Sequence, residues 1–83
     1  MNAGQRLTMA EVPTFIEQAR AAIRSGNRRI ELGGLTAVDS AALAALIELR
    51  RDPAGAQTEF VDPPDNLRKL ASLYGLDDLL FPA

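Results

Sequence analysis

The alternation of strand-like and helix-like segments constrains this chain most. Residues 28–32 are predicted to form a strand with Ile30 and Leu32 on one face, and residues 58–61 are predicted to form a second strand. Residues 40–51 between them repeat apolar side chains at helical spacing. Two strands that pair across an intervening helix run parallel, and the connection between them is right-handed. The pattern therefore predicts an α/β domain with a small, largely parallel sheet packed with helices.

Further helical segments lie on either side of this unit. Residues 9–24 carry an apolar stripe, and Thr8 with Glu11 three residues later resembles a capping box at its start. Residues 64–74 form another helix, and residues 77–81 form a last helical turn whose leucines pack on the core. The apolar positions of the helix at 64–74 are Leu67, Leu70, Ala71 and Leu73.

Length and charge limit the classes of protein to consider. The chain has 83 residues, which suits a single domain over residues 1–83. Its net charge of −2 argues against a nucleic-acid partner, since such proteins present a basic face. No apolar run reaches the roughly 20 residues that cross a bilayer, so we expect no membrane insertion. Residues 1–6 lack the apolar core of a signal peptide, and a cytoplasmic location is expected.

Catalytic chemistry has little support in the sequence. The absence of cysteine and histidine excludes a zinc site built from thiolates or imidazoles, a cysteine nucleophile and a histidine-based triad. The acidic residues are scattered over turns and helix ends, where a pair such as Asp77 and Asp78 serves as a cap. Gly33 and Gly34 are followed by Leu-Thr instead of the Gly-Lys-Ser/Thr of a phosphate-binding loop. We therefore expect a protein that is not an enzyme and needs no metal or cofactor.

The junction at Asp39 and Ser40, where strand gives way to helix, offers the most chemistry. Asp39 is predicted to cap the helix that starts at residue 40. Ser40 would then be exposed where backbone N–H groups lack partners and the helix dipole is positive. It is a candidate contact site and a candidate phosphorylation site. A phosphate there would be attracted to the helix end, although it would repel Asp39.

Alanines give a second indication in the same helix. Ala41, Ala42, Ala44 and Ala45 exceed what helix propensity requires, and small side chains let another helix or backbone approach closely. One alanine face must pack inside the domain, which leaves the other as a candidate docking surface. The predicted partner-binding residues are Leu35, Thr36, Asp39, Ser40, Ala41, Ala44 and Ala45.

The chain resembles the STAS domain family. Residues 30–46, which contain the run Val-Asp-Ser-Ala-Ala-Leu, resemble that family's central strand, loop and helix start. Residues 60–62 and 67–76 resemble its last strand and last helix, and residues 7–12 resemble the entry to its first helix. The resemblance covers about residues 7–80. The family includes bacterial anti-sigma factor antagonists and the small cytoplasmic subunit of Mla-type lipid-transport ABC systems.

One position separates these two subfamilies. Anti-sigma factor antagonists carry Asp-Ser-Ser-Gly, and the second serine is phosphorylated; Ala41 stands at that position here. Ser40 matches the preceding residue, a Thr or Ser at the ATPase-contacting helix end of Mla-type subunits, and Leu-Tyr-Gly-Leu at 73–76 also looks Mla-like. The resemblance therefore implies an ABC ATPase partner with its permease, in a phospholipid-transport system at the inner face of the inner membrane. The alternative is an anti-sigma factor antagonist that regulates transcription by binding a kinase-like anti-sigma factor.

The start of the chain departs from the family pattern. STAS domains begin with one or two strands before the first helix, and here only residues 5–8 are available for them. The N-terminal strands are therefore expected to be truncated. Either the true start codon lies upstream or another chain completes the sheet. Because an open sheet edge favours pairing, the second case predicts a homodimer.

Overall fold

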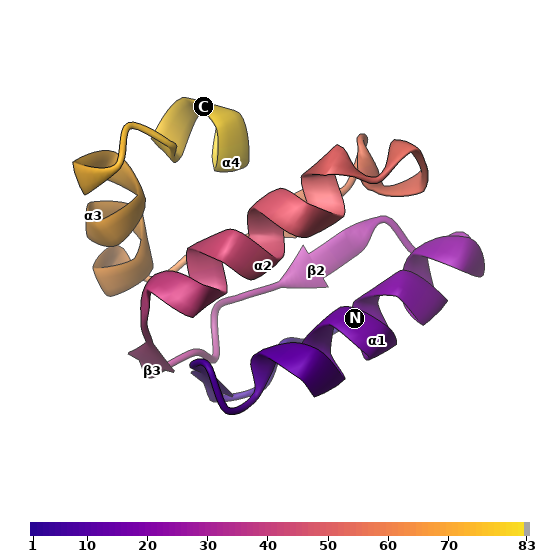
Figure 1. The fold of residues 1–83 in the computed structure, drawn as a ribbon, viewed down its shortest axis with the longest axis horizontal. Helices are drawn as coiled ribbons and strands as arrows, with labels where there is room; N and C mark the ends of the chain where they lie inside the picture. The colour runs from indigo at the N-terminus through magenta and orange to yellow at the C-terminus, as the bar shows by residue number, and fades with distance from the viewer. Residues whose placement is uncertain (83) are drawn as a thin grey trace.

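A computed structural model describes residues 1–82. The strands are β1 (Arg6–Leu7), β2 (Arg29–Glu31), β3 (Ala37–Val38) and β4 (Glu59–Val61). The helices are α1 (Val12–Arg24), α2 (Ser40–Arg51), α3 (Asp65–Leu73) and α4 (Asp77–Leu80), with a 3-10 turn η1 (Pro53–Gly55) after α2. Helices α1 and α2 lie side by side, with β2 behind them (Figure 1).

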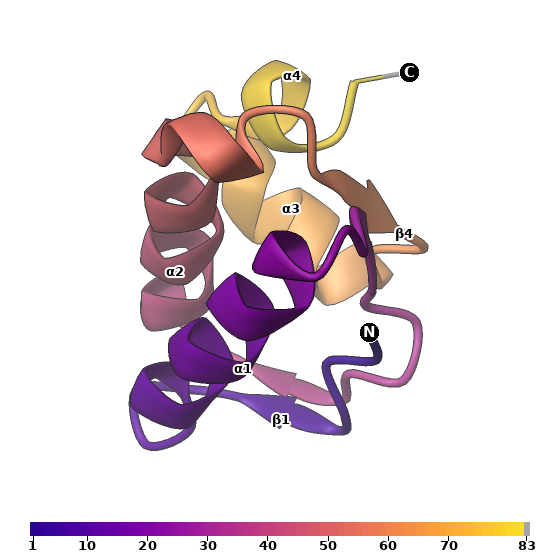
Figure 2. The same cartoon turned by 90° about the vertical axis from the view of Figure 1, so that its right-hand side faces the viewer.

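The strands pair in parallel, as the alternation of strands and helices predicts. Strand β2 pairs with β4, with Ile30 opposite Phe60, and β1 pairs with β3, with Leu7 opposite Val38. The first residues of the chain link the two pairs, because Asn2 bridges to Glu31 in parallel register. Across the strands the order is therefore β4, β2, residues 1–7 and β3. Seen from the side, α2 and β4 lie on opposite sides of the molecule (Figure 2).

The start of the chain fills the gap that the sequence suggests. The two-residue β1 is the strand that precedes α1. Residues 1–3 nevertheless extend the pairing, since the Ala3 N–H donates to the Glu31 carbonyl at 2.9 Å and the Glu31 N–H donates to the Met1 carbonyl at 2.8 Å. The homodimer was inferred from an incomplete sheet, and that reason is removed. The oligomeric state itself stays a prediction.

Helix α1 begins at Val12, later than predicted, because Glu11 organises a turn in front of it. The Glu11 Oε1 atom accepts hydrogen bonds from the Thr8 N–H at 2.9 Å and from the Thr8 hydroxyl at 2.6 Å. The carboxylate thus makes its half of a capping box, while the hydroxyl bonds the carboxylate instead of a helix N–H. These Thr8 hydrogen bonds, with a smaller contribution from the positive charge of Arg6, lower the pKa of Glu11.

The core lies between the helices and the strands. Every strand and helix except β3 places a buried apolar side chain there, and the largest fully buried apolar side chains are Leu7, Ile30, Leu32, Leu46, Leu49, Leu67 and Leu80. The sequence analysis grouped Leu73 with the apolar positions of its helix, but Leu73 is 82% exposed. At 3.6 residues per turn it lies about 120° around the helix from Leu67, and so off the inner face.

Candidate protein-binding surface

Asp39 fixes the start of α2 as its N-cap, which confirms the prediction. One carboxylate oxygen, Oδ1, accepts the Ala41 N–H at 2.9 Å. The other, Oδ2, accepts the Met9 N–H at 3.1 Å, from the turn that precedes α1. A single half-buried side chain therefore ties the first turn of α2 to a segment about 30 residues earlier in the chain. Asp39 therefore positions the start of α2, and both of its carboxylate oxygens are already used in doing so.

An exposed ridge runs along α2 from its first residue. Ser40, Ala44 and Glu48 are exposed at intervals of four residues, so they share one face of the helix. We call these three residues the α2 ridge. Because Ala44 is the smallest of the three, the helix backbone comes closest to the surface at the middle of the ridge. A partner helix can approach most closely there.

Two shallow hollows flank the α2 ridge. The hollow on the α3 side has a volume of about 220 Å³ and is lined by Ser40, Leu43, Ala44, Ile47, Tyr74 and Leu76. The hollow on the α1 side has a volume of about 180 Å³ and is lined by Val12, Ile16, Arg20, Ala44, Ala45 and Glu48. Ala44 lines both hollows, so the middle of the α2 ridge is a small residue between two depressions that can receive side chains from a partner.

Two of the predicted contact residues lie in the core instead. Leu35 is 3% exposed, because the hydrogen bond from its N–H to the Leu32 carbonyl closes a turn that buries its side chain. Ala45 is 2% exposed on the face of α2 that packs inward with Leu46 and Leu49. Both residues support the surface from beneath, and in this structure their side chains are not available to a partner.

The other predicted contact residues are accessible to different degrees. Thr36 is exposed, and its hydroxyl donates to the Gln5 carbonyl at 3.2 Å, so it also helps to hold the loop in place. Ser40 and Ala44 are exposed and line the same hollow. Ala41 is half-buried, like Asp39. The structure thus brings Ser40 and Ala44 together at the surface and leaves Thr36 in the adjoining loop.

Sequence reasoning missed the contribution of α3 to this surface. Tyr74 is 61% exposed and lines the hollow beside Ser40 and Ala44, and the neighbouring Leu73 is more exposed still. Large exposed apolar side chains next to a hollow are characteristic of protein interfaces, where tyrosine is enriched. The sequence contained a signal for this surface, because helical spacing places the apolar Leu73 away from the inner face of its helix.

Comparison with known families decides the classification. Residues 1–81 match the family described as "Mlab, STAS domain". The chain belongs to this family. Searches of the curated proteins and of the solved structures give no match. STAS domains are generally non-catalytic and act by binding other proteins. The mixed α/β fold with small parallel strand pairs agrees with the membership.

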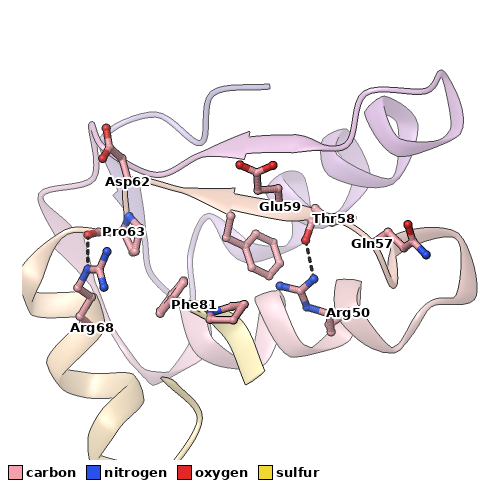
Figure 3. Close-up of a pocket in the computed structure, with 10 residues that line it drawn as sticks. Arg50, Gln57, Thr58, Glu59, Asp62, Pro63, Arg68 and Phe81 are labelled. Carbon is pink, nitrogen blue, oxygen red and sulfur yellow. Dashed lines mark hydrogen bonds between the residues drawn. The ribbon is translucent and has the colours of Figure 1, made fainter. Parts of the chain in front are cut away.

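Besides the two hollows of the α2 ridge, the domain has a larger depression beside β4 (Figure 3). We call it the β4 groove; it has a volume of about 490 Å³ and is lined by Arg50, Gln57, Thr58, Glu59, Phe60, Asp62, Pro63, Arg68, Phe81 and Pro82. Arg50 Nη1 donates to the Thr58 carbonyl at 2.5 Å, and the guanidinium carbon lies 4.7 Å from the centroid of the Phe60 ring. Burial lowers the pKa of Arg50, which still stays protonated near neutral pH.

The sequence analysis gave Arg50 no role, although helical spacing places it on the same side of α2 as Leu43 and Leu46. An arginine on the apolar side of a helix needs hydrogen-bond acceptors, and carbonyl groups from the strand and from α4 supply them. Across residues 1–82 no group of three or more acidic residues is placed to hold a metal ion. Among the same residues, no helix is long and apolar enough to cross a membrane.

Proposed function

We propose that this STAS domain is a non-catalytic subunit that docks on the ATPase of an ABC transporter. The system would carry phospholipids and maintain outer-membrane lipid asymmetry, and the ATPase with its permease would hold the domain at the inner face of the inner membrane. The observation that carries the proposal is the α2 ridge, a line of exposed residues between two hollows with the small Ala44 at its centre. The membership in an MlaB-type family supports the choice of partner.

The geometry suits a helix of the partner laid against α2. Ala44 allows a close approach of the two backbones, and side chains of the partner can enter the hollows on either side. Tyr74 supplies a large apolar surface with a polar tip, the kind of residue that dominates binding energy at interfaces. Ser40 offers a hydroxyl at the edge of the contact. Asp39 would hold the helix start in the conformation that presents Ser40.

An anti-sigma factor antagonist remains the second candidate, because the same surface would serve it. In that case a kinase-like anti-sigma factor would bind and phosphorylation would release it. The serine hydroxyl that is phosphorylated in those antagonists is absent here, because Ala41 stands at that position, which leaves Ser40 as the nearest acceptor. Incubation with ATP and a cognate kinase, followed by measurement of the intact mass, separates the candidates. A gain of one phosphate at Ser40 would favour the second.

The first test is affinity purification of the tagged protein from its native cells, with mass spectrometry of the proteins recovered. We expect an ABC ATPase with its permease. The Ser40→Arg variant should lose the ATPase because the larger charged side chain blocks the ridge. Ser72→Arg introduces the same side chain at an exposed serine of α3 that lines neither hollow of the ridge, and should keep it.

Undiminished recovery of the ATPase with Ser40→Arg would refute the docking site. Recovery of a kinase-like anti-sigma factor would replace the transporter proposal with the regulatory one. The homodimer expected from an incomplete sheet forms no part of the proposal, since residues 1–3 already pair with β2.

A further inference from the structure

Strand β4 is an edge strand whose free side faces the β4 groove. The Glu59 N–H donates to the Arg28 carbonyl at 2.7 Å, and the Val61 carbonyl accepts the Leu32 N–H at 2.8 Å. In a parallel ladder alternate residues bond the same neighbour, so Glu59 and Val61 face β2. The backbone groups of Thr58 and Phe60 therefore face the other way, and both residues line the groove. The Thr58 N–H already donates to the Gly55 carbonyl at 3.0 Å, so the outward groups are the Thr58 carbonyl and the N–H and carbonyl of Phe60.

An arginine side chain takes the place of a neighbouring strand at one end of this edge. Arg50, from α2, donates to the outward carbonyl of Thr58. Arg68, from α3, donates from Nε at 3.3 Å to the carbonyl of Pro63, which lies beyond the end of the strand. An added strand would present backbone N–H groups to carbonyls along this edge. Figure 3 shows the two arginines at opposite ends of the groove, with Phe81 between them.

Phe81 packs against the side chain of Phe60, the middle residue of the strand, and both line the β4 groove. Its ring meets Phe60 edge-on, with centroids 6.4 Å apart and an interplanar angle of 75°. The chain is held there by Arg50, whose Nη2 donates to the Leu80 carbonyl at 3.2 Å, and by Leu80, which is fully buried. One guanidinium thus connects α2 to both β4 and α4. If it is lost, the end of the strand and the ring packed against its middle residue are released together.

A second copy of β4 suits this edge. Antiparallel pairing centred on Phe60 would place Phe60 opposite Phe60, Glu59 opposite Val61, and Thr58 opposite Asp62. No like charges would then face each other directly, so charge repulsion does not protect the edge. Exposed edges that lack such protection invite pairing between molecules, and proteins commonly cover them.

We propose that Arg50 and Phe81 form a cap that keeps the β4 edge from pairing with the β4 edge of a second copy. The cap acts on a surface that shares no lining residue with the two hollows of the α2 ridge. It is therefore independent of the partner proposed above. Arg50 serves as a positioning residue, since it holds Phe81 in place through the Leu80 carbonyl.

The test compares Arg50→Leu with Arg51→Leu in the full chain. Arg51 is the exposed neighbour on the same helix, so the control removes the same charge and adds the same apolar side chain. Sedimentation velocity over a concentration series should show a monomeric parent, a monomeric control, and an Arg50→Leu variant whose self-association is at least about tenfold tighter. Hydrogen exchange followed by NMR should show the Phe60 amide slowing as that dimer forms.

Phe81→Ser provides a second route to the same conclusion, because it removes the ring that packs against Phe60 and leaves Arg50 in place. We expect it to dimerise with the same slowing at Phe60, and it decides the question if Arg50→Leu does not fold by circular dichroism. Folded variants that stay monomeric at every concentration would overturn the proposal. So would dimers in which the Phe60 amide exchanges at the parental rate, or a parent that already pairs through this edge.

Discussion

At the scale of single residues, Asp39 has the clearest structural task, and its removal gives the first prediction. Asp39→Ala deprives the N–H groups of Ala41 and Met9 of their acceptor. We expect the free energy of unfolding to fall by about 1–2 kcal/mol, the cost typical of a lost N-cap. Urea denaturation measures it. The sequence analysis expected Asp77 and Asp78 to cap a helix, but Leu76 occupies the N-cap of α4 and no side chain caps it. Asp78→Ala, at an exposed position, should therefore stay within about 0.5 kcal/mol of the parent. Equal effects of the two changes would contradict this role.

Glu11 gives a prediction about pH. Its pKa is lowered by the hydrogen bonds from Thr8 and then by Arg6, so the folded state holds the carboxyl proton less tightly than the unfolded state does. The stability that it contributes is complete above the pKa of the unfolded state and is lost as the pH falls through the folded pKa. The urea midpoints of the parent and of Glu11→Gln should therefore converge on acidification. Glu17→Gln, at an exposed position on α1, is the matched control for the loss of a surface carboxylate. A constant gap between parent and Glu11→Gln would refute the prediction.

At the scale of elements, the predictability of a segment depends on whether its signals are local. Helix α2 was predicted with its observed bounds, because Asp39 caps its start and Pro53 follows its end. Strands β1 and β3 have two residues each and depend on pairing with segments about 30 positions away. No periodicity exists in so short a run. The sequence therefore predicted the helices and the β2–β4 pair well, but gave no sign of β3.

The same distinction applies to the candidate surface. Helical spacing alone puts Ser40 and Ala44 on one face, and the structure exposes both. The burial of Leu35 depends on the direction of a turn, and that of Ala45 on how α2 packs. The place of Tyr74 beside Ala44 depends on how α3 docks against α2. All three features depend on tertiary packing, about which composition and spacing carry no information.

Two neighbouring alanines of α2 should respond differently to enlargement. Ala44→Phe should leave the unfolding free energy within about 0.5 kcal/mol of the parent, because the position is exposed, yet it should abolish recovery of the ATPase. Ala45→Phe should lower the unfolding free energy by about 1–3 kcal/mol or more, because it overfills the core. Urea denaturation and co-purification measure the two effects. Unchanged recovery of the ATPase with Ala44→Phe would contradict the role of the α2 ridge.

At the scale of the whole molecule, the two surfaces belong to different sides of the fold. The α2 ridge lies between α1 and α3, whereas the β4 groove lies along the strand that Figure 2 places opposite α2. A partner bound at the ridge would leave the β4 edge uncovered. The cap of Arg50 and Phe81 would then be needed in the bound and the free domain alike. This separation can be tested in one experiment.

Hydrogen–deuterium exchange on the purified complex provides that experiment. Binding of the ATPase should slow exchange in residues 36–47 and 73–76, where the partner excludes water and restrains the end of α3. Exchange in residues 57–63 should match that of the free domain, since the β4 groove lies outside the contact. Slowing centred on residues 57–63 would place the partner on the β4 edge and remove the α2 ridge from the docking site. The Ser72→Arg variant should reproduce the parental pattern, because its complex keeps the same contact.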